Sequence, residues 1–294
     1  MEASIKASYL WKKHLTEFHL RKNVRVQLSG DPEAETWANV LLQIGEGKLA
    51  PKTGIIKPPE PVHIKCKNKN DLIDEIFPDV GINFERDGWL SSRAILAPKN
   101  DVVDDINELI MQKIPGVAEV YYSTDCPIKG PDSIQYPTEV LNSLSFPGIP
   151  AHRIILKKGV PVIVMRNINA PMLVNGTRLQ ITELGRSKLT GKILVGAYAG
   201  QEVYIPRIAF IPKDCAIEFK RIQFPVKVSF SMSINKSQGQ TLKKVGLWLE
   251  EPCFAHGQFY VGCSRVGSDK NLKIACPDQG TRNVVYKEAL GQLM

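Results

Sequence analysis

The stretch PVKVSFSMSI, residues 225–234, alternates apolar and polar side chains without a break. One face would carry Val226, Val228, Phe230, Met232 and Ile234. This period of two predicts a β-strand with one face against a core. The polar segment INKSQGQTL, residues 234–242, follows directly. Because α/β sheets bind ligands beyond the carboxyl ends of their strands, the two segments together favour an α/β domain with a ligand site in the loop.

The polar loop has two interpretations. Gly239 would let the backbone approach a phosphate closely, while Gln238, Gln240 and Thr241 can exchange hydrogen bonds with a ligand. The alternative is an ordinary turn from a strand to a helix, capped by Ser237. Spacing alone favours the ordinary turn, so the loop does not identify a function by itself.

Further strand and helix patterns lie on both sides of this loop. RAILAP, residues 93–98, predicts a buried strand, and the amphipathic run at 100–114 predicts a helix. A second helix is expected at 36–47, and VGLWL and NLKIA predict strands on either side of a short helix, HGQFYVGCSRV. Strands that alternate with helices are typical of an α/β domain.

Residues 141–220 have a different rhythm, with short strands broken by turns. The strand patterns are GVPVIVM, NGTRLQITEL, KILVGAYAG and QEVYIPRIAF. The Asn175-Gly176 pair is a strong hairpin signal. This spacing predicts a small antiparallel barrel or sandwich inserted into the α/β domain. Tyr198, Tyr204 and Phe210 occur at strand spacing, which favours packing over stacking on nucleic-acid bases.

Composition narrows the class of protein. The chain has 294 residues and a net charge of +8, which favours an anionic partner such as nucleic acid. No signal peptide and no apolar run of about 18 residues occurs, so we expect an intracellular protein without a membrane span. The six cysteines form no C-x-x-C pair, so we predict neither a metal site nor a disulfide framework.

Two arginines are candidates for phosphate binding. Arg265 lies near the end of a short apolar helix in YVGCSRVGS, where a guanidinium could bind a phosphate or stabilise charge during phosphoryl transfer. The alternative is a cation that complements the helix dipole. Arg25 in LRKNVRV is the second candidate, with a solvated basic cluster as its alternative.

A long resemblance joins these features. Residues 223–274, which include SFSMSINKSQGQTL and GQFYVGCSRVGS, resemble motifs V and VI of the petite-integration-frequency (PIF) DNA helicases, especially the Helitron-transposon branch. LWKKHLTEFHLRKNVRV resembles the family's junction motif with an arginine, and RAILAPKNDVVDDIN resembles its next strand–helix motif. Residues 156–179 and VYIPRIAF resemble its small β-barrel insert.

The resemblance implies a superfamily-one motor that hydrolyses ATP with Mg²⁺ between two RecA-like domains and moves 5′ to 3′ along single-stranded DNA. It implies a junction segment at 1–26, a second RecA-like domain at 27–140 and 222–294, and a β-barrel insert at 141–221. Arg25 and Arg265 would contact the γ-phosphate. The nucleotide cleft would include Gln238, Gly239 and Gln240, and the DNA track would include Asn100, Ser233, Asn235 and Lys236.

Two parts of such a motor are not recognisable in the sequence. GEGKLA, residues 45–50, lacks the spacing of the G-x-x-x-x-G-K-[ST] phosphate loop, and Asp74 and Glu75 in LIDEIF begin no convincing magnesium site. We therefore expect a carboxyl-terminal half, inactive without a first RecA-like domain. The alternatives are a non-enzymatic single-stranded DNA-binding remnant and an unrelated α/β protein. The nucleus is the expected compartment, with an organelle as the alternative.

Overall fold

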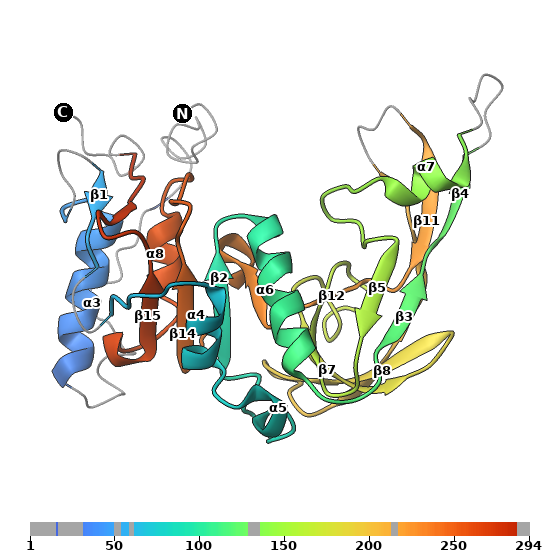
Figure 1. Ribbon diagram of the computed structural model, residues 1–294, viewed down its shortest axis with the longest axis horizontal. Helices are drawn as coiled ribbons and strands as arrows, with labels where there is room; N and C mark the ends of the chain where they lie inside the picture. The colour runs from blue at the N-terminus through green and yellow to red at the C-terminus, as the bar shows by residue number, and fades with distance from the viewer. Residues whose placement is uncertain are drawn as a thin grey trace. The chain divides into compact units, whose positions relative to one another are not determined.

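The computed structural model describes residues 16, 32–49, 54–58, 62–128, 136–212 and 217–286 (Figure 1). The chain divides into two compact units. Unit 1 consists of Met1–Ile76, Ile95–Val103 and Met232–Met294, and unit 2 consists of Phe77–Ala94 and Asp104–Ser231. The chain therefore passes between the units four times, and each unit is described by itself below.

The core of unit 1 is a four-stranded sheet with the strand order β13-β2-β14-β15. Its strands are β13 (Ser231–Ser233), β2 (Arg93–Ala97), β14 (Lys244–Trp248) and β15 (Leu272–Ala275). β14 and β15 are parallel. Lys99, just after β2, forms an ion pair with Glu251, just after β14, so the carboxyl ends of these two strands lie at the same edge. This sheet confirms the predicted α/β class.

The helical elements that accompany this sheet are α3 (Pro32–Gly45), α4 (Lys69–Ile76), α6 (Asn100–Lys113), α8 (Gln258–Cys263) and the 3₁₀ turns η2 (Ile234–Ser237) and η3 (Asp269–Asn271). Three helices, α3, α6 and α8, lie where the apolar patterns predict helices, at 36–47, 100–114 and 256–266. A small ladder joins β1 (Ile55–Ile56) to β16 (Thr281–Arg282). α4 lies directly on β14 (Figure 1), because a Cβ added at Gly246 would come within 2.8 Å of Ile76 Cγ1.

Unit 2 is built from antiparallel strands. The five-stranded sheet contains β12 (Val226–Val228), β6 (Pro161–Val164), β7 (Arg178–Leu184), β8 (Lys188–Ile193) and β9 (Glu202–Pro206), in that order. A second sheet contains β10 (Ile208–Phe210), β11 (Phe219–Gln223) and β4 (Thr124–Pro127), and a third pairs β3 (Glu119–Tyr122) with β5 (Arg153–Leu156). Two short helices, α5 (Val80–Asn83) and α7 (Thr138–Ser143), complete the unit.

The antiparallel strands predicted for 141–220 are confirmed, but a closed barrel is not. β12 and β9 are the edges of the five-stranded sheet, and within the described ranges no strand pairs them with each other. The Asn175-Gly176 pair does form a turn, in which Thr177 N donates to Val174 O at 3.0 Å. This turn ends the long connection between β6 and β7 instead of joining the two strands directly.

The alternating stretch 225–234 is not a single strand, so that prediction is wrong. It forms β12 and β13, which belong to different sheets, and Ser229 and Ser231 are buried where the pattern predicts a solvent-exposed face. Asn107 explains the interruption. Its Nδ2 donates to Val228 O and Ser231 O at 3.1 Å, and its Oδ1 accepts from Ser231 N at 2.8 Å. A side-chain amide thus replaces a strand partner at the break.

Unit 2 also buries two arginines completely. Arg178 donates to the carbonyl oxygens of Leu90, Ser91 and Ser229 at 3.3–3.4 Å. Burial lowers the pKa of the Arg178 guanidinium to about 10. Since no described carboxylate is within ion-pair distance of Arg178, backbone dipoles compensate its charge.

Candidate functional site

The polar loop begins as a tight 3₁₀ turn. η2 follows β13 immediately, and the Ser237 side chain is buried, with its Oγ donating to Ile234 O at 2.7 Å. Asn235, Lys236 and Gln238 are exposed around it. The hydroxyl of Ser237 therefore stabilises the turn from inside, and the loop presents its amide and ammonium groups to solvent.

Gly239 provides the backbone conformation that the loop needs. Its φ is +82°, in the left-handed region, and a Cβ added there would meet nothing within 4 Å. Conformation, not space, therefore selects glycine at this position.

Replacing Gly239 with alanine is expected to lower the free energy of unfolding by about 1 kcal/mol, and asparagine should cost less because it tolerates this region. Urea unfolding followed by circular dichroism measures both. Gly267→Ala is the matched control, since that site is equally open but its φ is not in the left-handed region. An equal cost at both glycines would contradict the explanation.

Arg265 ties the loop to α8. Its Nη1 donates to Ser237 O at 3.1 Å and to Gln240 O at 2.9 Å, and its Nη2 donates to Ser264 Oγ at 2.8 Å. The Arg265 carbonyl also accepts from Leu242 N at 2.9 Å. The structure thus brings together Arg265 and Gln240, which the sequence predicts to share one site.

The same arginine also serves the helix end. Its Nε donates to Val261 O at 2.7 Å, in the last turn of α8, as expected for a cation that satisfies terminal carbonyls. The contact with the helix end agrees with the second interpretation of Arg265, and its binding of a phosphate stays a prediction.

The residues predicted to face DNA lie near the ends of neighbouring strands. Ser233 ends β13 and is half-buried, and Asn235 and Lys236 follow it in η2. Asn100 is exposed as the first residue of α6, three residues after β2, which is next to β13 in the sheet. Arg25 lies outside the described residues.

Asp74 and Glu75, the two carboxylates considered for magnesium, lie in α4. Among the described residues, no group of three or more His, Cys, Asp or Glu side chains could hold a metal ion. Glu75 pairs with Lys244, whose Nζ lies 3.0 Å from Glu75 Oε1 and also donates to Glu75 O. This carboxylate therefore joins α4 to β14. Within the same ranges, no helix is long and apolar enough to cross a membrane.

The cysteines also differ from one another. Cys253 and Cys263 are buried, as expected for core thiols, whereas Cys66, Cys126 and Cys276 are only half-buried. Burial raises the pKa of Cys253 to about 12. That thiol therefore stays protonated and unreactive at neutral pH.

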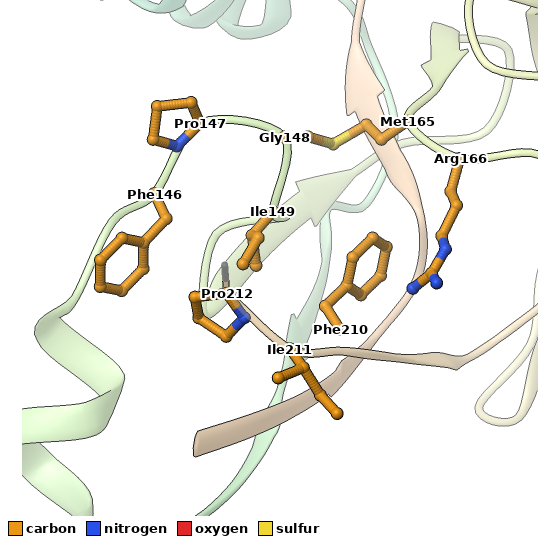
Figure 2. A pocket seen from close by; sticks show the side chains of 9 residues that line it. All are labelled: Phe146, Pro147, Gly148, Ile149, Met165, Arg166, Phe210, Ile211 and Pro212. Carbon is orange, nitrogen blue, oxygen red and sulfur yellow. The ribbon is translucent and has the colours of Figure 1, made fainter. Parts of the chain in front are cut away.

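A separate pocket of about 500 Å³ lies in unit 2 (Figure 2). Its lining includes Phe146, Ile149, Phe210, Ile211 and Pro212, with Arg166 at one side. The Arg166 guanidinium lies 5.6 Å from the centre of the Phe210 ring, and Nη1 donates to Ala209 O at 2.9 Å. None of the predicted site residues lines this pocket, so it is distinct from the polar loop.

One predicted packing residue is exposed. Phe210 is 4% exposed, as expected for packing, but Tyr204 is 58% exposed and Lys188 Nζ lies 4.2 Å from its ring centre. The prediction of a packing role is therefore wrong for Tyr204. Val203 and Ile205, the neighbours of Tyr204 in β9, are buried. Side chains alternate between the two faces of a strand, so this pattern places Tyr204 on the outer face.

The positive charge is concentrated in the strand-rich part of the chain. Residues 141–231 contain 13 Lys and Arg against four Asp and Glu, whereas the other residues contain 25 against 26. The net charge of the chain therefore comes from the segment that forms most of unit 2. A segment of this kind favours contact with a polyanion.

Comparisons with known proteins agree on one family. A family profile for the 2B domain of the DNA helicase Pif1 matches residues 139–184. The ATP-dependent DNA helicase PIF1 of Danio rerio is 31% identical over 195 residues, which cover 65% of this chain and 28% of that helicase. The chain spans less than a third of the length of the curated relatives it matches first.

Solved structures agree in fold. The crystal structure of the Pif1 helicase from Candida albicans aligns with a TM-score of 0.63 at 21% identity, covering 97% of this chain and 62% of that one. A Pif1 helicase from Bacteroides, crystallised with ADP-AlF3 and single-stranded DNA, aligns with a TM-score of 0.54 at 20% identity, covering 87% and 51%. These neighbours support the RecA-like α/β fold. Together with the family profile and the sequence relatives, they show that the chain resembles a carboxyl-terminal portion of the Pif1 family of DNA helicases.

Proposed function

We propose that this chain supplies the second motor domain of an ATP-dependent helicase that moves 5′ to 3′ on single-stranded DNA. The observation that carries the proposal is the hydrogen-bonded unit formed by Arg265, Ser237 and Gln240. It joins the arginine proposed for the γ-phosphate to a loop whose residues 235 and 236 are proposed to face DNA and whose residues 238–240 are proposed to lie beside the nucleotide. A movement of Arg265 at the nucleotide would then shift the loop that faces DNA, through the carbonyl groups of Ser237 and Gln240, and the reverse would also hold.

In this proposal residues 1–26 form the junction segment, 27–140 and 222–294 form the second RecA-like domain, and 141–221 form the insert. Arg25 and Arg265 contact the γ-phosphate of ATP, with Gln238, Gly239 and Gln240 beside the nucleotide. The DNA side of the domain consists of Asn100, Ser233, Asn235 and Lys236. Relatives that act on DNA favour the nucleus, or an organelle that contains DNA, as the compartment. The proposed Helitron origin rests on the sequence resemblance.

The chain is proposed to be inactive alone. Its sequence has no G-x-x-x-x-G-K-[ST] segment, and among its described residues no group of three or more His, Cys, Asp or Glu side chains could hold a metal ion. A first RecA-like domain, in the same polypeptide or another, would therefore hold the triphosphate and Mg²⁺. The arginines of this chain would act on a nucleotide bound there.

Binding to single-stranded DNA tests the proposal directly. Anisotropy of a labelled oligonucleotide, titrated with the chain at several salt concentrations, should show an affinity that falls steeply as salt rises. Lys236→Gln should weaken binding to all sequences and reduce the salt slope by about 0.7, the value for one phosphate contact on a single strand. Lys243→Gln is the matched control, because Lys243 is also exposed but lies outside β13 and η2. Equal slopes for both variants would contradict the role of Lys236.

A second candidate is a non-enzymatic DNA-binding protein. The excess of basic residues in 141–231 favours it, because that charge does not depend on the polar loop. The two functions differ in their response to nucleotide. If the chain is joined to the amino-terminal motor portion of a PIF1 relative, the helicase proposal expects ATP to change DNA affinity, and the binding-protein proposal expects no change.

A further inference from the structure

A second surface that could contact DNA lies around Tyr122 in unit 2. Tyr122 is the last residue of β3 and is 57% exposed, so the core does not use its ring. In the antiparallel pair of β3 and β5 (Figure 1), Tyr122 lies directly opposite Arg153, which is also exposed. Directly opposite residues point to the same face of a sheet, so the ring and the guanidinium share one face.

Two more basic side chains contact Tyr122. The His152 ring lies 5.4 Å from the Tyr122 ring, centre to centre, at an angle of 45°. Arg207 Nη1 donates to Tyr122 O at 2.8 Å. The Tyr122 ring therefore has the His152 ring beside it and Arg153 on the same face of the sheet, whereas Arg207 binds the backbone carbonyl of Tyr122.

Hydrogen bonds hold His152 in place. Ser123 Oγ donates to Asp125 Oδ1 at 2.7 Å and lies 2.8 Å from His152 Nδ1. A hydroxyl has one proton, which goes to the carboxylate, so His152 Nδ1 must be the donor to Ser123 Oγ. The other ring nitrogen, Nε2, takes no part in these two bonds. The imidazole is thus oriented before any ligand arrives.

Arg207 is also held before binding. Its Nη1 donates to Gln223 Oε1 at 3.1 Å, and its guanidinium lies 4.6 Å from the centre of the Phe224 ring. Gln223 Nε2 in turn donates to Tyr121 O at 3.1 Å and to His152 O at 3.0 Å. These bonds fix the backbone on both sides of Tyr122, so the exposed ring sits on a rigid base.

We propose that Tyr122, His152 and Arg153, supported by Arg207, form a stacking platform for an unpaired base of single-stranded DNA. The Tyr122 ring would contact the base, and Arg153 would contact a flanking phosphate. Every base has a π-face, so such a platform accepts any sequence. The inference rests on the proposed function for its partner, but it uses residues remote in sequence from the motif loop.

The chemistry favours nucleic acid over an acidic peptide. Basic side chains meet at an aromatic ring, as in proteins that bind single strands, and the adjoining segment 141–231 carries a large excess of basic residues. Tyr204 offers a contrast on the same unit. It is equally exposed and also has a cation at its ring, Lys188 Nζ at 4.2 Å, but Thr190, directly opposite it, is bonded to Glu183, so a carboxylate lies on that face.

Photocrosslinking to an oligonucleotide with 5-iodouracil at successive positions tests this platform. Tryptic mapping of the full chain should find the crosslink on Tyr122. Tyr122→Ala should lower affinity for single-stranded DNA by about 5- to 150-fold without changing the salt slope, whereas Tyr122→Phe should keep the affinity. Arg153→Gln should reduce the slope by about 0.7. Tyr204→Ala is the matched control and should change little.

The outcomes separate this inference from the proposed function. If the unmodified chain binds the oligonucleotide but Tyr122→Ala behaves as Tyr204→Ala does, with the crosslink elsewhere, the platform is wrong and the helicase proposal stands. If the unmodified chain does not bind single-stranded DNA, both are wrong. Circular dichroism of each variant checks folding, and the Tyr122→Phe variant distinguishes loss of the ring from loss of structure. Binding of a poly-glutamate peptide in preference to DNA would also overturn the platform.

Discussion

Replacing Asp125 with alanine is expected to lower the free energy of unfolding by about 3–5 kcal/mol. Arg221 binds this carboxylate through two nitrogens, with Nε 3.0 Å from Oδ1 and Nη2 2.7 Å from Oδ2. The two side chains are 1% and 0% exposed. Without the carboxylate, a cation remains buried with only the carbonyl oxygens of Leu141, Leu144 and Pro150 as acceptors. Urea unfolding followed by circular dichroism measures the loss.

An exposed ion pair in the same unit provides the control. Lys192 Nζ lies 3.3 Å from Asp87 Oδ1, and the Asp87 side chain is 94% exposed. Asp87→Ala should therefore cost only about 0–1 kcal/mol. The double change Asp125→Leu with Arg221→Met should recover much of the stability that Asp125→Ala loses, because it removes both buried charges. Equal unfolding midpoints for Asp125→Ala and Asp87→Ala would contradict this account.

The elements that the sequence predicts well have strong local patterns. The apolar run at 93–98 forms β2, and the amphipathic run at 100–114 forms α6 (Asn100–Lys113). Both depend on side-chain periodicity within a few residues, which the sequence displays directly. The resemblance of 223–274 likewise agrees with the comparisons, since the relatives are ATP-dependent DNA helicases named PIF1.

The predictions that failed depend on contacts distant in sequence. The alternation at 225–234 looks like one strand until Asn107, 124 residues before Ser231, takes up the backbone groups at the break. The pairing of Arg221 with Asp125 spans 96 residues in the same way. A sequence pattern predicts Arg and Ser to lie at the surface, where most polar residues are found. Burial of a polar group depends on a hydrogen-bond partner, which periodicity does not reveal.

The candidate site was predicted in part. The resemblance selects Arg265 and the loop as parts of one site, and the structure brings the guanidinium to the carbonyls of Ser237 and Gln240. That these contacts are made to backbone oxygens could not be predicted, because spacing does not say where a long side chain ends. The proposed base platform around Tyr122 has no motif at all, since it joins β3 to β5 across the fold.

Replacing Arg265 with alanine is expected to loosen the polar loop. The change removes the donors to Ser237 O and Gln240 O, so the amide hydrogens of residues 238–242 should exchange faster in a hydrogen-exchange experiment on the chain. Arg265→Lys should rescue this only in part, because one ammonium group cannot contact the loop carbonyls and also replace the bonds of Nε to Val261 O and of Nη2 to Ser264 Oγ. Unchanged exchange in Arg265→Ala would show that the arginine does not hold the loop.

The same substitution has a larger expected effect on catalysis. When the chain is joined to the amino-terminal motor portion of a PIF1 relative, Arg265→Ala should lower the kcat for DNA-stimulated ATP hydrolysis by at least about 100-fold, since an arginine at the γ-phosphate stabilises charge in the transition state. DNA affinity, measured in parallel, separates two causes. A fall in kcat at nearly constant affinity supports a phosphate contact, whereas equal falls in both would mean that Arg265 acts only through the loop. Robust hydrolysis by the chain alone, abolished in Arg265→Ala, would overturn the proposal that it needs a first RecA-like domain.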